Sequence, residues 1–328
     1  MKTKTGLSKR LNGLAYGMGL ALAACAGGAL AQDTVRAAVG QRGNFDTLFI
    51  SQGVDAGIFK REGLQIEITW TRGGAETLQA VITNSADVAI ANGILGVIGA
   101  VSKGAPLKIV SAQMTGAPDL FWYVKADSPV KSMKDMTGRS MGYSRPGSST
   151  DLIGHALADH FGVKPKFVST GGIPDTRTQV MSGQIEAGWS VPHFNFDLLN
   201  EGKIRIIARG TELASLAEQT VRVNVAGQKF LTERRDVARR FMKAYHDSIE
   251  WVYANPDKAN AFYAAFNKVT PQVARQTLES FPKSAVAGWP VKGLKKNIEE
   301  AIEHKQLTKP LAESEAQALL YDFVYEAR

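Results

Sequence analysis

Short apolar runs of strand length alternate with longer stretches of helical spacing along most of this chain. The runs at residues 34–39 and 88–91 enclose two helix-like segments, and the runs at 140–143 and 187–190 enclose two more. The order strand, helix, strand, helix, strand requires a largely parallel sheet, because parallel neighbours are joined by crossover helices. The pattern therefore predicts an α/β protein with two mixed, mainly parallel sheets flanked by helices.

An internal repeat supports two copies of this unit. Sliding the sequence by 99 residues places 59–68 over 158–167, and both segments show a helix end, a glycine and a strand. Gly-Gly pairs at 73–74 and 171–172 precede the second helix of each copy, with a slip of one residue. Glycines at helix ends and turns occur in all α/β proteins and would produce part of this match by chance. The order of the matching segments nevertheless favours a duplicated architecture of two lobes.

Four more strand-like runs link the copies, at 107–114, 120–125, 204–208 and 220–225. The second run leads the chain into the other lobe, and the last two bring it back. We therefore expect the first lobe to begin with 32–117, the second to cover 118–212, and 213–328 to return to the first lobe and end in helices. The hinge strands should lie near 114–121 and 208–220.

The last hundred residues are predicted to be mainly helical. Favourable helix starts occur at Thr232, at Asn255 with Pro256, and at Thr270 with Pro271. Apolar side chains recur at helical spacing at Phe241, Tyr245, Ile249 and Val252. This spacing indicates core packing rather than an aromatic cage for a ligand.

The first 31 residues differ from the rest. Four basic residues and no acidic one precede the apolar run 11–24, which is too short to span a bilayer as a helix. This is the layout of a cleavable secretory signal, and we predict a signal peptide over 1–31 and a periplasmic mature protein. The segment 22–25 also resembles a lipoprotein box, in which case Cys25 would carry a lipid anchor.

Charge and cysteine content narrow the function. Removing 1–31 lowers the formal charge from +8 to +4, because four basic and no acidic residues leave with it. The remaining basic residues are scattered and match no nucleic-acid motif, so we expect no nucleic-acid partner. The sequence has no cysteine after Cys25, and its five histidines show no metal-ligand spacing, so we expect neither a metal nor a cofactor.

Candidate binding residues follow the predicted strands, because ligands of open α/β sheets bind outside the carboxyl ends of strands. The loop after the first strand supplies Arg42, Gly43, Asn44 and Phe45. The corresponding loop of the second copy supplies Ser144, Arg145, Gly147, Ser148, Ser149 and Thr150. The closing strands add Asn92, Trp189 and His193.

These residue types suit a small anion. A loop rich in glycine and hydroxyl groups before a helix offers backbone N–H donors and the positive end of the helix dipole. Arg42 and Arg145 could each grip an anion through two N–H groups, while Asn92 can donate and accept. Trp189 would add an apolar wall with an N–H donor. Each of these residues also has a structural interpretation, as a core, capping or surface residue.

The order of several segments resembles a known family, the nitrate, sulfonate and taurine group of ABC transporter substrate-binding proteins. The resemblance rests on 57–64, 73–76, 86–89, 133–139 and 144–151, and it extends over residues 34–300. It implies a type II periplasmic binding fold with a ligand cleft between two lobes. It also implies a monomer that closes on a small sulfonate, taurine, nitrate or carboxylate and docks on a membrane permease.

Two other functions use the same fold. One is a biosynthetic enzyme for cofactor precursors, and the other is a ligand-binding sensor subunit. The sequence lacks a His-Glu-x-x-His pattern, and Pro146 stands where a G-x-S-x-G nucleophile elbow needs glycine. We therefore predict a non-enzymatic binding protein, with the enzyme and the sensor as alternatives.

Overall fold

The computed structural model describes residues 32–321. The predicted signal peptide, both of its alternative processing sites and Cys25 lie outside these residues. None of the helices that the model describes between Gln32 and Tyr321 is both long enough and apolar enough to cross a membrane.

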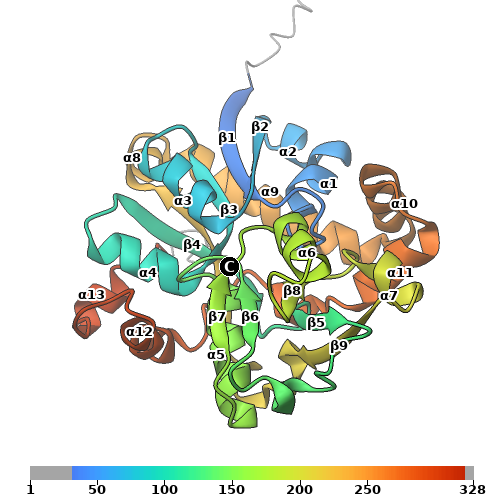
Figure 1. Cartoon of the computed structure of the whole chain (residues 1–328). Coiled ribbons are helices and arrows are strands. Elements are labelled where there is room, and N and C mark those ends of the chain that lie inside the picture. Colours follow the sequence, from blue (N-terminus) through green and yellow to red (C-terminus); the bar gives the residue numbers. More distant parts are fainter. Residues whose placement is uncertain (1–31, 322–328) are drawn as a thin grey trace, which may run out of the picture. The chain divides into compact units, whose positions relative to one another are not determined.

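The first sheet has five strands in the order β2-β1-β3-β10-β4. Its strands are β1 (Asp33–Gly40), β2 (Leu64–Thr71), β3 (Val88–Gly93), β4 (Leu107–Thr115) and β10 (Thr220–Gly227). Strand β1 runs parallel to β2 and β3, whereas β10 runs antiparallel to its neighbours β3 and β4. The sheet is therefore parallel except for the one strand that returns late in the sequence. Figure 1 labels its strands β1, β2, β3 and β4.

The second set of strands repeats this arrangement. It comprises β5 (Phe121–Lys125), β6 (Ser140–Tyr143), β7 (Lys166–Ser169), β8 (Gly188–Ser190) and β9 (Ile204–Arg209). Strands β6 and β7 are parallel, and β5 pairs antiparallel with β8 and β9. These strands form the sheets β8-β5-β9 and β6-β7, and two backbone hydrogen bonds of Ala187, the residue before β8, link the two sheets through Gly142 and Ser140. The resulting order β7-β6-β8-β5-β9 matches the first sheet strand for strand.

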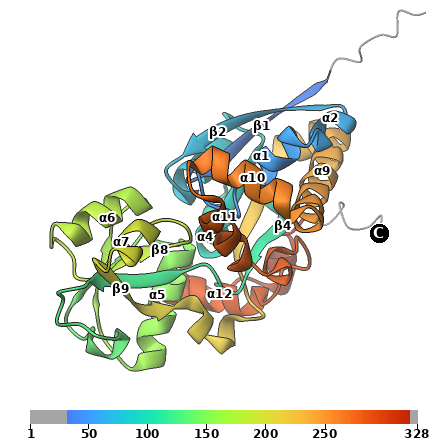
Figure 2. The same cartoon turned by 90° about the vertical axis from the view of Figure 1, so that its right-hand side faces the viewer.

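Helices cover both sheets. The first lobe, built on the first sheet, carries α1 (Phe49–Asp55), α2 (Ile58–Arg61), α3 (Gly74–Ile82), α4 (Ile94–Ser102) and α8 (Gln228–Glu233). It also carries α9 (Arg235–Ala254), α10 (Pro256–Asn267), α11 (Pro271–Glu279), α12 (Leu294–Glu303) and α13 (Glu313–Gln317). The second lobe carries α5 (Ser149–Phe161), α6 (Ile173–Met181) and α7 (Phe196–Asn200). Figure 2 shows α5, α6 and α7 beside β8 and β9, and α1, α2, α9 and α10 in the other part of the molecule with β1 and β2.

Four single turns of 3-10 helix complete the described chain, at Met133–Asp135, Gly210–Glu212, Ala214–Leu216 and Lys283–Val286. The chain passes between the sheets twice, over 116–120 and over 210–219. Both passages fall within 114–121 and 208–220, the ranges predicted for the hinge, but they are loops and 3-10 turns rather than strands. The α/β class and the mixed, mainly parallel sheets are confirmed.

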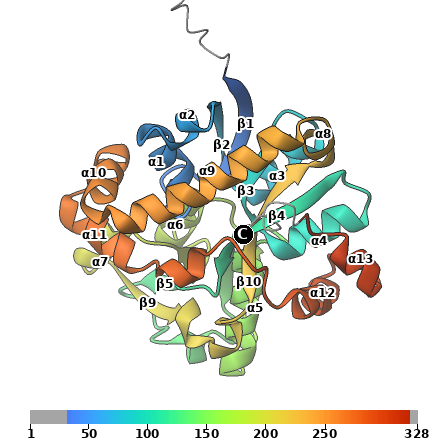
Figure 3. The ribbon, with the colours of Figure 1, turned by 180° about the vertical axis from the view of Figure 1, so that it is seen from behind.

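The long helix α9 crosses the back of the first sheet (Figure 3) and packs on α1. Its apolar stripe is buried, including Phe241, Tyr245, Ile249 and Val252, so the prediction of core packing is confirmed. Two predicted helix starts are also correct: Pro256 opens α10 and Pro271 opens α11, where Thr270 accepts a hydrogen bond from the Val273 N–H at 3.3 Å. The prediction that a helix begins at Thr232 was wrong. Thr232 lies inside α8, where its hydroxyl donates a hydrogen bond to Gln228 O.

Replacement of Gly53 by alanine tests the contact between α1 and α9. A Cβ at Gly53 would overlap the Ser248 hydroxyl and lie 2.9 Å from the Phe59 ring. Overpacking of this kind costs about 1–3 kcal/mol, of which the better helix propensity of alanine recovers about 1 kcal/mol. We expect urea unfolding to show a lower free energy of unfolding for G53A. The exposed neighbour Val54, replaced by alanine, should change it little; equal stability of G53A and wild type would contradict this packing.

Candidate functional site

A cavity of about 600 Å³ lies between the two lobes. The first lobe contributes the loop after β1, the Gly73-Gly74 turn and the end of β3, and the second contributes the loop between β6 and α5 together with Trp189. A volume of this size suits a small molecule. The cavity thus occupies the position at the carboxyl ends of β1, β3 and β6 at which the sequence predicted a site.

The start of α5 forms one wall of the cavity. Ser148 caps the helix by accepting a hydrogen bond from the Asp151 N–H at 3.2 Å, and the Thr150 hydroxyl accepts one from the Ser144 N–H at 2.8 Å. Ser149 and Thr150 are buried, line the cavity and contribute backbone N–H groups to the first helical turn, where no intrahelical acceptor exists. The positive end of a 13-residue helix therefore meets the cavity.

Asn92, at the end of β3, lines the same cavity from the first lobe. It is 1% exposed and lines the cavity, yet neither its amide oxygen nor its amide nitrogen has a hydrogen-bond partner. The preceding residue, Ala91, has φ of +65°, and the register of β3 against β10 shifts between Val223 and Val225. Such irregularities redirect side chains next to binding sites, which explains how a strand residue comes to present its amide there.

A buried ionic group forms the floor. The Arg222 guanidinium donates to Asp119 Oδ2 at 2.6 Å, and its Nε lies 3.6 Å from Asp46 Oδ2. Gln113 Nε2 donates to the same Asp46 oxygen at 2.8 Å. Burial raises the pKa of Asp119; Arg222 opposes this rise, and Asp46 adds to it. One cation thus holds two carboxylates, and both Arg222 and Asp46 line the cavity.

Direct contacts hold the two lobes together around the cavity. The Gly96 N–H donates to Gly147 O at 3.0 Å, and Arg145 lies 3.5 Å from Glu76 Oε1. The approach at Gly93 leaves no room for a side chain, because a Cβ there would lie 2.7 Å from the Ser148 Cα. The described arrangement is therefore a closed one, with both walls within reach of one small molecule.

Most of the residues predicted from the sequence line this cavity: Asn44, Asn92, Ser144, Arg145, Gly147, Ser148, Ser149, Thr150 and Trp189. Two of them differ in detail from expectation. Trp189 lines the cavity, but its ring N–H already donates a hydrogen bond to Thr170 Oγ1 at 3.2 Å, so it is not free to bind a ligand. Arg145 already pairs with Glu76, a partner that the sequence did not suggest.

The other four predicted residues do not line the cavity. Arg42 is exposed and lies over the Phe266 ring, with its guanidinium carbon 4.5 Å from the ring centroid. Phe45 is fully buried against the rings of Phe49 and Phe281, so it belongs to the core. The polar, glycine-rich composition of the loop pointed to a segment that borders the cavity, but it did not show which side of the loop faces inward.

Gly43 and His193 form a separate contact between the lobes. His193 Nδ1 lies 2.5 Å from the Tyr263 hydroxyl, which donates to Gly43 O at 3.2 Å. His193 follows β8 of the second lobe, whereas Tyr263 belongs to α10 of the first. Burial lowers the pKa of His193 to about 4, against a small opposing effect of Asp197. His193 is therefore neutral in the folded protein at neutral pH.

Sequence reasoning missed several lining residues: Gln41, Asp46, Thr47, Arg72 and Arg222. Three of these, Gln41, Asp46 and Thr47, belong to the same loop after β1 as the predicted residues 42–45. Taking the whole loop as the candidate site would have included them. Arg222 gave no such signal, because a single arginine in a short strand usually faces solvent. Its burial depends on Asp119, which lies 103 residues earlier and meets it only through the fold.

Replacing Arg222 by methionine should lower the free energy of unfolding by about 3–5 kcal/mol at neutral pH, because Asp46 and Asp119 would stay buried without a cation. Without Arg222 the pKa of Asp119 rises further. A carboxyl group whose pKa is raised by folding stabilises the protein below its unfolded pKa and loses that contribution as the pH rises. The deficit of R222M should therefore shrink as the pH is lowered towards 4, as measured by urea unfolding. Adding Asp119→Asn should restore part of the loss, and a deficit below about 1 kcal/mol at pH 7 would contradict the ionic floor.

His193 should make the folded protein sensitive to mild acid. Because folding lowers its pKa, its contribution to stability is complete above about pH 6.5 and is lost as the pH falls through about 4. The free energy of unfolding should drop by roughly 1 kcal/mol per pH unit across this range from His193 alone. We expect a shallower loss for H193Q than for wild type. The exposed His160, replaced by glutamine, should leave the wild-type slope unchanged, and equal slopes for all three proteins would refute this role.

Known proteins resemble this chain in sequence and in fold. The family model described as "NMT1/THI5 like" matches residues 44–259. YtlA of Bacillus subtilis (strain 168), provisionally named as a binding protein, is 22% identical over 238 residues, which cover 69% of each chain. The 4-amino-5-hydroxymethyl-2-methylpyrimidine phosphate synthase THI13 of Saccharomyces cerevisiae (strain ATCC 204508 / S288c) is 21% identical over 231 residues, which cover 67% of this chain and 66% of the enzyme.

Among solved structures, the alkanesulfonate-binding protein SsuA from Xanthomonas axonopodis pv. citri bound to MOPS superimposes with a TM-score of 0.73. The two are 16% identical, and the match covers 86% of this chain and 97% of SsuA. This likeness confirms the two-lobed periplasmic binding fold. Together with the family model, which spans well over half of the sequence, it shows that the chain belongs to the NMT1/THI5-like family.

Proposed function

We propose that this protein is the periplasmic solute-binding component of an ABC importer, which holds a small anion between its lobes and delivers it to a membrane permease. The observation that carries the proposal is the unpaired amide of Asn92, buried in a closed cavity opposite the start of α5. A buried amide without partners costs about 1–3 kcal/mol. A bound solute that supplies both a donor and an acceptor removes this cost.

The start of α5 supports an anion. Four basic residues also line the cavity, Arg72, Lys103, Arg145 and Arg222, but Arg72 and Arg145 pair with Glu76, and Arg222 pairs with Asp46 and Asp119. The N–H groups at the start of α5 are oriented for a carboxylate, sulfonate or similar oxyanion. We place the anionic group of the solute at Ser149 and Thr150.

The opposite wall supports hydrogen-bond donors on the rest of the solute. Three buried acceptor atoms of lining residues have no partner: Asn44 Oδ1, Asp46 Oδ1 and Asn92 Oδ1. A simple inorganic anion such as nitrate would leave all three unpaired. An organic acid that carries an amino, hydroxyl or amide group at its other end satisfies both walls, so we favour this class within the sulfonates and carboxylates.

Cleft closure supplies the mechanism. The solute bridges groups of both lobes, and the passages 116–120 and 210–219 are the segments that must bend. Closure is then a shift of population, limited by the difference in affinity between the open and closed forms. Arg145 and Glu76 close over the cavity from opposite lobes and add to the preference for the closed form.

A ligand screen tests this function. The purified protein is heated with taurine, alkanesulfonates, nitrate, bicarbonate, aromatic carboxylates and thiamine pyrimidine precursors, and hits are confirmed by calorimetry. We expect an amino- or hydroxy-substituted acid to raise the melting temperature most. The likeness to the THI13 synthase makes catalysis the second candidate. Formation of a new product from a hit, detected by mass spectrometry, would overturn the binding-protein proposal.

Asn92→Leu separates binding from folding. Leucine has a similar volume and removes the unpaired polar atoms, so we expect N92L to unfold at the same temperature as wild type or at a higher one. Its affinity for the solute should fall at least about tenfold, which corresponds to about 1.4 kcal/mol. Asn224 on the neighbouring strand is the matched control. Its amide oxygen accepts from the Ala91 N–H and its nitrogen donates to Ser111 Oγ, so N224L should be destabilised. A destabilised N92L with wild-type affinity would refute the role of Asn92.

A further inference from the structure

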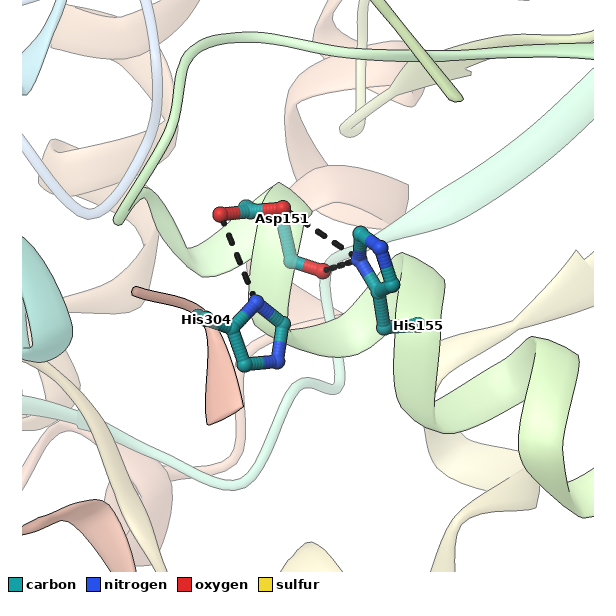
Figure 4. A group of neighbouring side chains, drawn as sticks. All are labelled: Asp151, His155 and His304. Carbon is teal, nitrogen blue, oxygen red and sulfur yellow. Dashed lines mark hydrogen bonds and ion pairs between the residues drawn. The ribbon is translucent and has the colours of Figure 1, made fainter. Parts of the chain in front are cut away.

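Outside the lining of the cavity, three side chains meet between the lobes. Asp151 and His155 lie one turn apart on α5, and His304 follows the end of α12. Helix α12 packs on α4, and Asn297 within it donates to Thr220 O of β10, so His304 belongs to the first lobe. Figure 4 shows both imidazole rings turning a nitrogen towards Asp151.

The distances in this cluster fit a metal ion. Asp151 Oδ1 lies 3.2 Å from His155 Nδ1, and Asp151 Oδ2 lies 3.5 Å from His304 Nδ1. Ligand atoms around a tetrahedral Zn²⁺ are about 3.4 Å apart, since each lies about 2.1 Å from the metal. One ligand atom of each of the three residues lies within 4.8 Å of the other two, which is wider than the tetrahedral spacing, so the side chains must draw closer when they bind an ion.

The surroundings of the cluster hold its members in place. The His155 ring stacks on Phe167, with ring centroids 3.7 Å apart, and Gly147 N–H donates to Asp151 Oδ2 at 2.8 Å. Burial raises the pKa of Asp151, but hydrogen bonds with His155, His304 and Gly147 outweigh this effect and lower it well below its usual range. Asp151 is therefore an ionised carboxylate, the form that binds metals.

We propose that Asp151, His155 and His304 form a binding site for a divalent transition-metal ion of borderline softness, such as Zn²⁺. Two imidazoles and one carboxylate suit Zn²⁺, Co²⁺ or Ni²⁺, whereas Mg²⁺ and Ca²⁺ prefer oxygen ligands. Because the ligands come from both lobes, the metal stabilises the closed arrangement. The His155 side chain is 40% exposed, which gives the ion a route into the site.

Calorimetric titration with ZnCl₂ tests the proposal on tag-free protein, purified after expression of the full sequence and treated with a chelator. We expect one saturable site per chain and a melting temperature that rises with Zn²⁺ but not with Mg²⁺ or Ca²⁺. Co²⁺ in the same site should show the visible absorption of a cobalt ion with nitrogen ligands.

Two variants locate the ion. H304Q and H155Q should each weaken Zn²⁺ binding at least about tenfold and abolish the Co²⁺ absorption. H160Q changes an exposed histidine on the same helix α5 and should bind as wild type does. Melting curves recorded in chelator show whether each variant folds. If only one of H304Q and H155Q folds, its Zn²⁺ affinity alone is enough for the test. No saturable binding to wild type, or equal binding by H304Q and H155Q and wild type, would overturn the proposal.

Discussion

The ion pair between Arg222 and Asp119 is the interaction on which the two-lobed arrangement depends. Asp119 lies on the first passage between the lobes, and Arg222 lies on β10, just after the second. Asp46, the third member, ends the loop that brings Asn44 to the cavity. A single buried guanidinium therefore fixes both crossing segments and the floor of the cavity. A buried charge must be neutralised where it stands, so these three segments keep one relative position, about which the lobes can turn.

The sequence predicted the sheets well because their signals are local. Apolar runs of four to eight residues and Gly-Gly turns recur with the strands, and each predicted run coincides with a strand from β1 to β10. The sequence predicted that β10 brings the chain back to the first lobe, but it did not predict its antiparallel direction. Pairing between Val88–Gly93 and Thr220–Gly227 leaves no signal in the local sequence. The failed helix start at Thr232 shows the limit of capping signals, since a threonine hydroxyl also bonds well within a helix.

The site was predictable as a set of loops but less so as a set of side chains. Ser148, Ser149 and Thr150 were recognisable because hydroxyl groups before a helix have a defined role at its first turn. Phe45 and Arg42 were misplaced because the direction of each side chain depends on partners in α10, more than 200 residues away. The cluster of His155 and His304 was invisible for the same reason: 149 residues separate the two rings, and no spacing rule connects them.

The late return of β10 has a consequence for how the chain assembles. The second lobe draws β5 to β9 from one continuous stretch, 121–209, whereas the first sheet needs β10 from beyond that stretch to join β3 to β4. As the chain is synthesised from its amino end, β3 and β4 therefore remain unjoined until residue 220 appears. An open strand edge is a site of faulty association, so the first half is obliged to wait for the second. A chain cut at the first passage would separate β10 from β3 and β4 and leave the first sheet incomplete, whereas the strands of the second lobe would stay together.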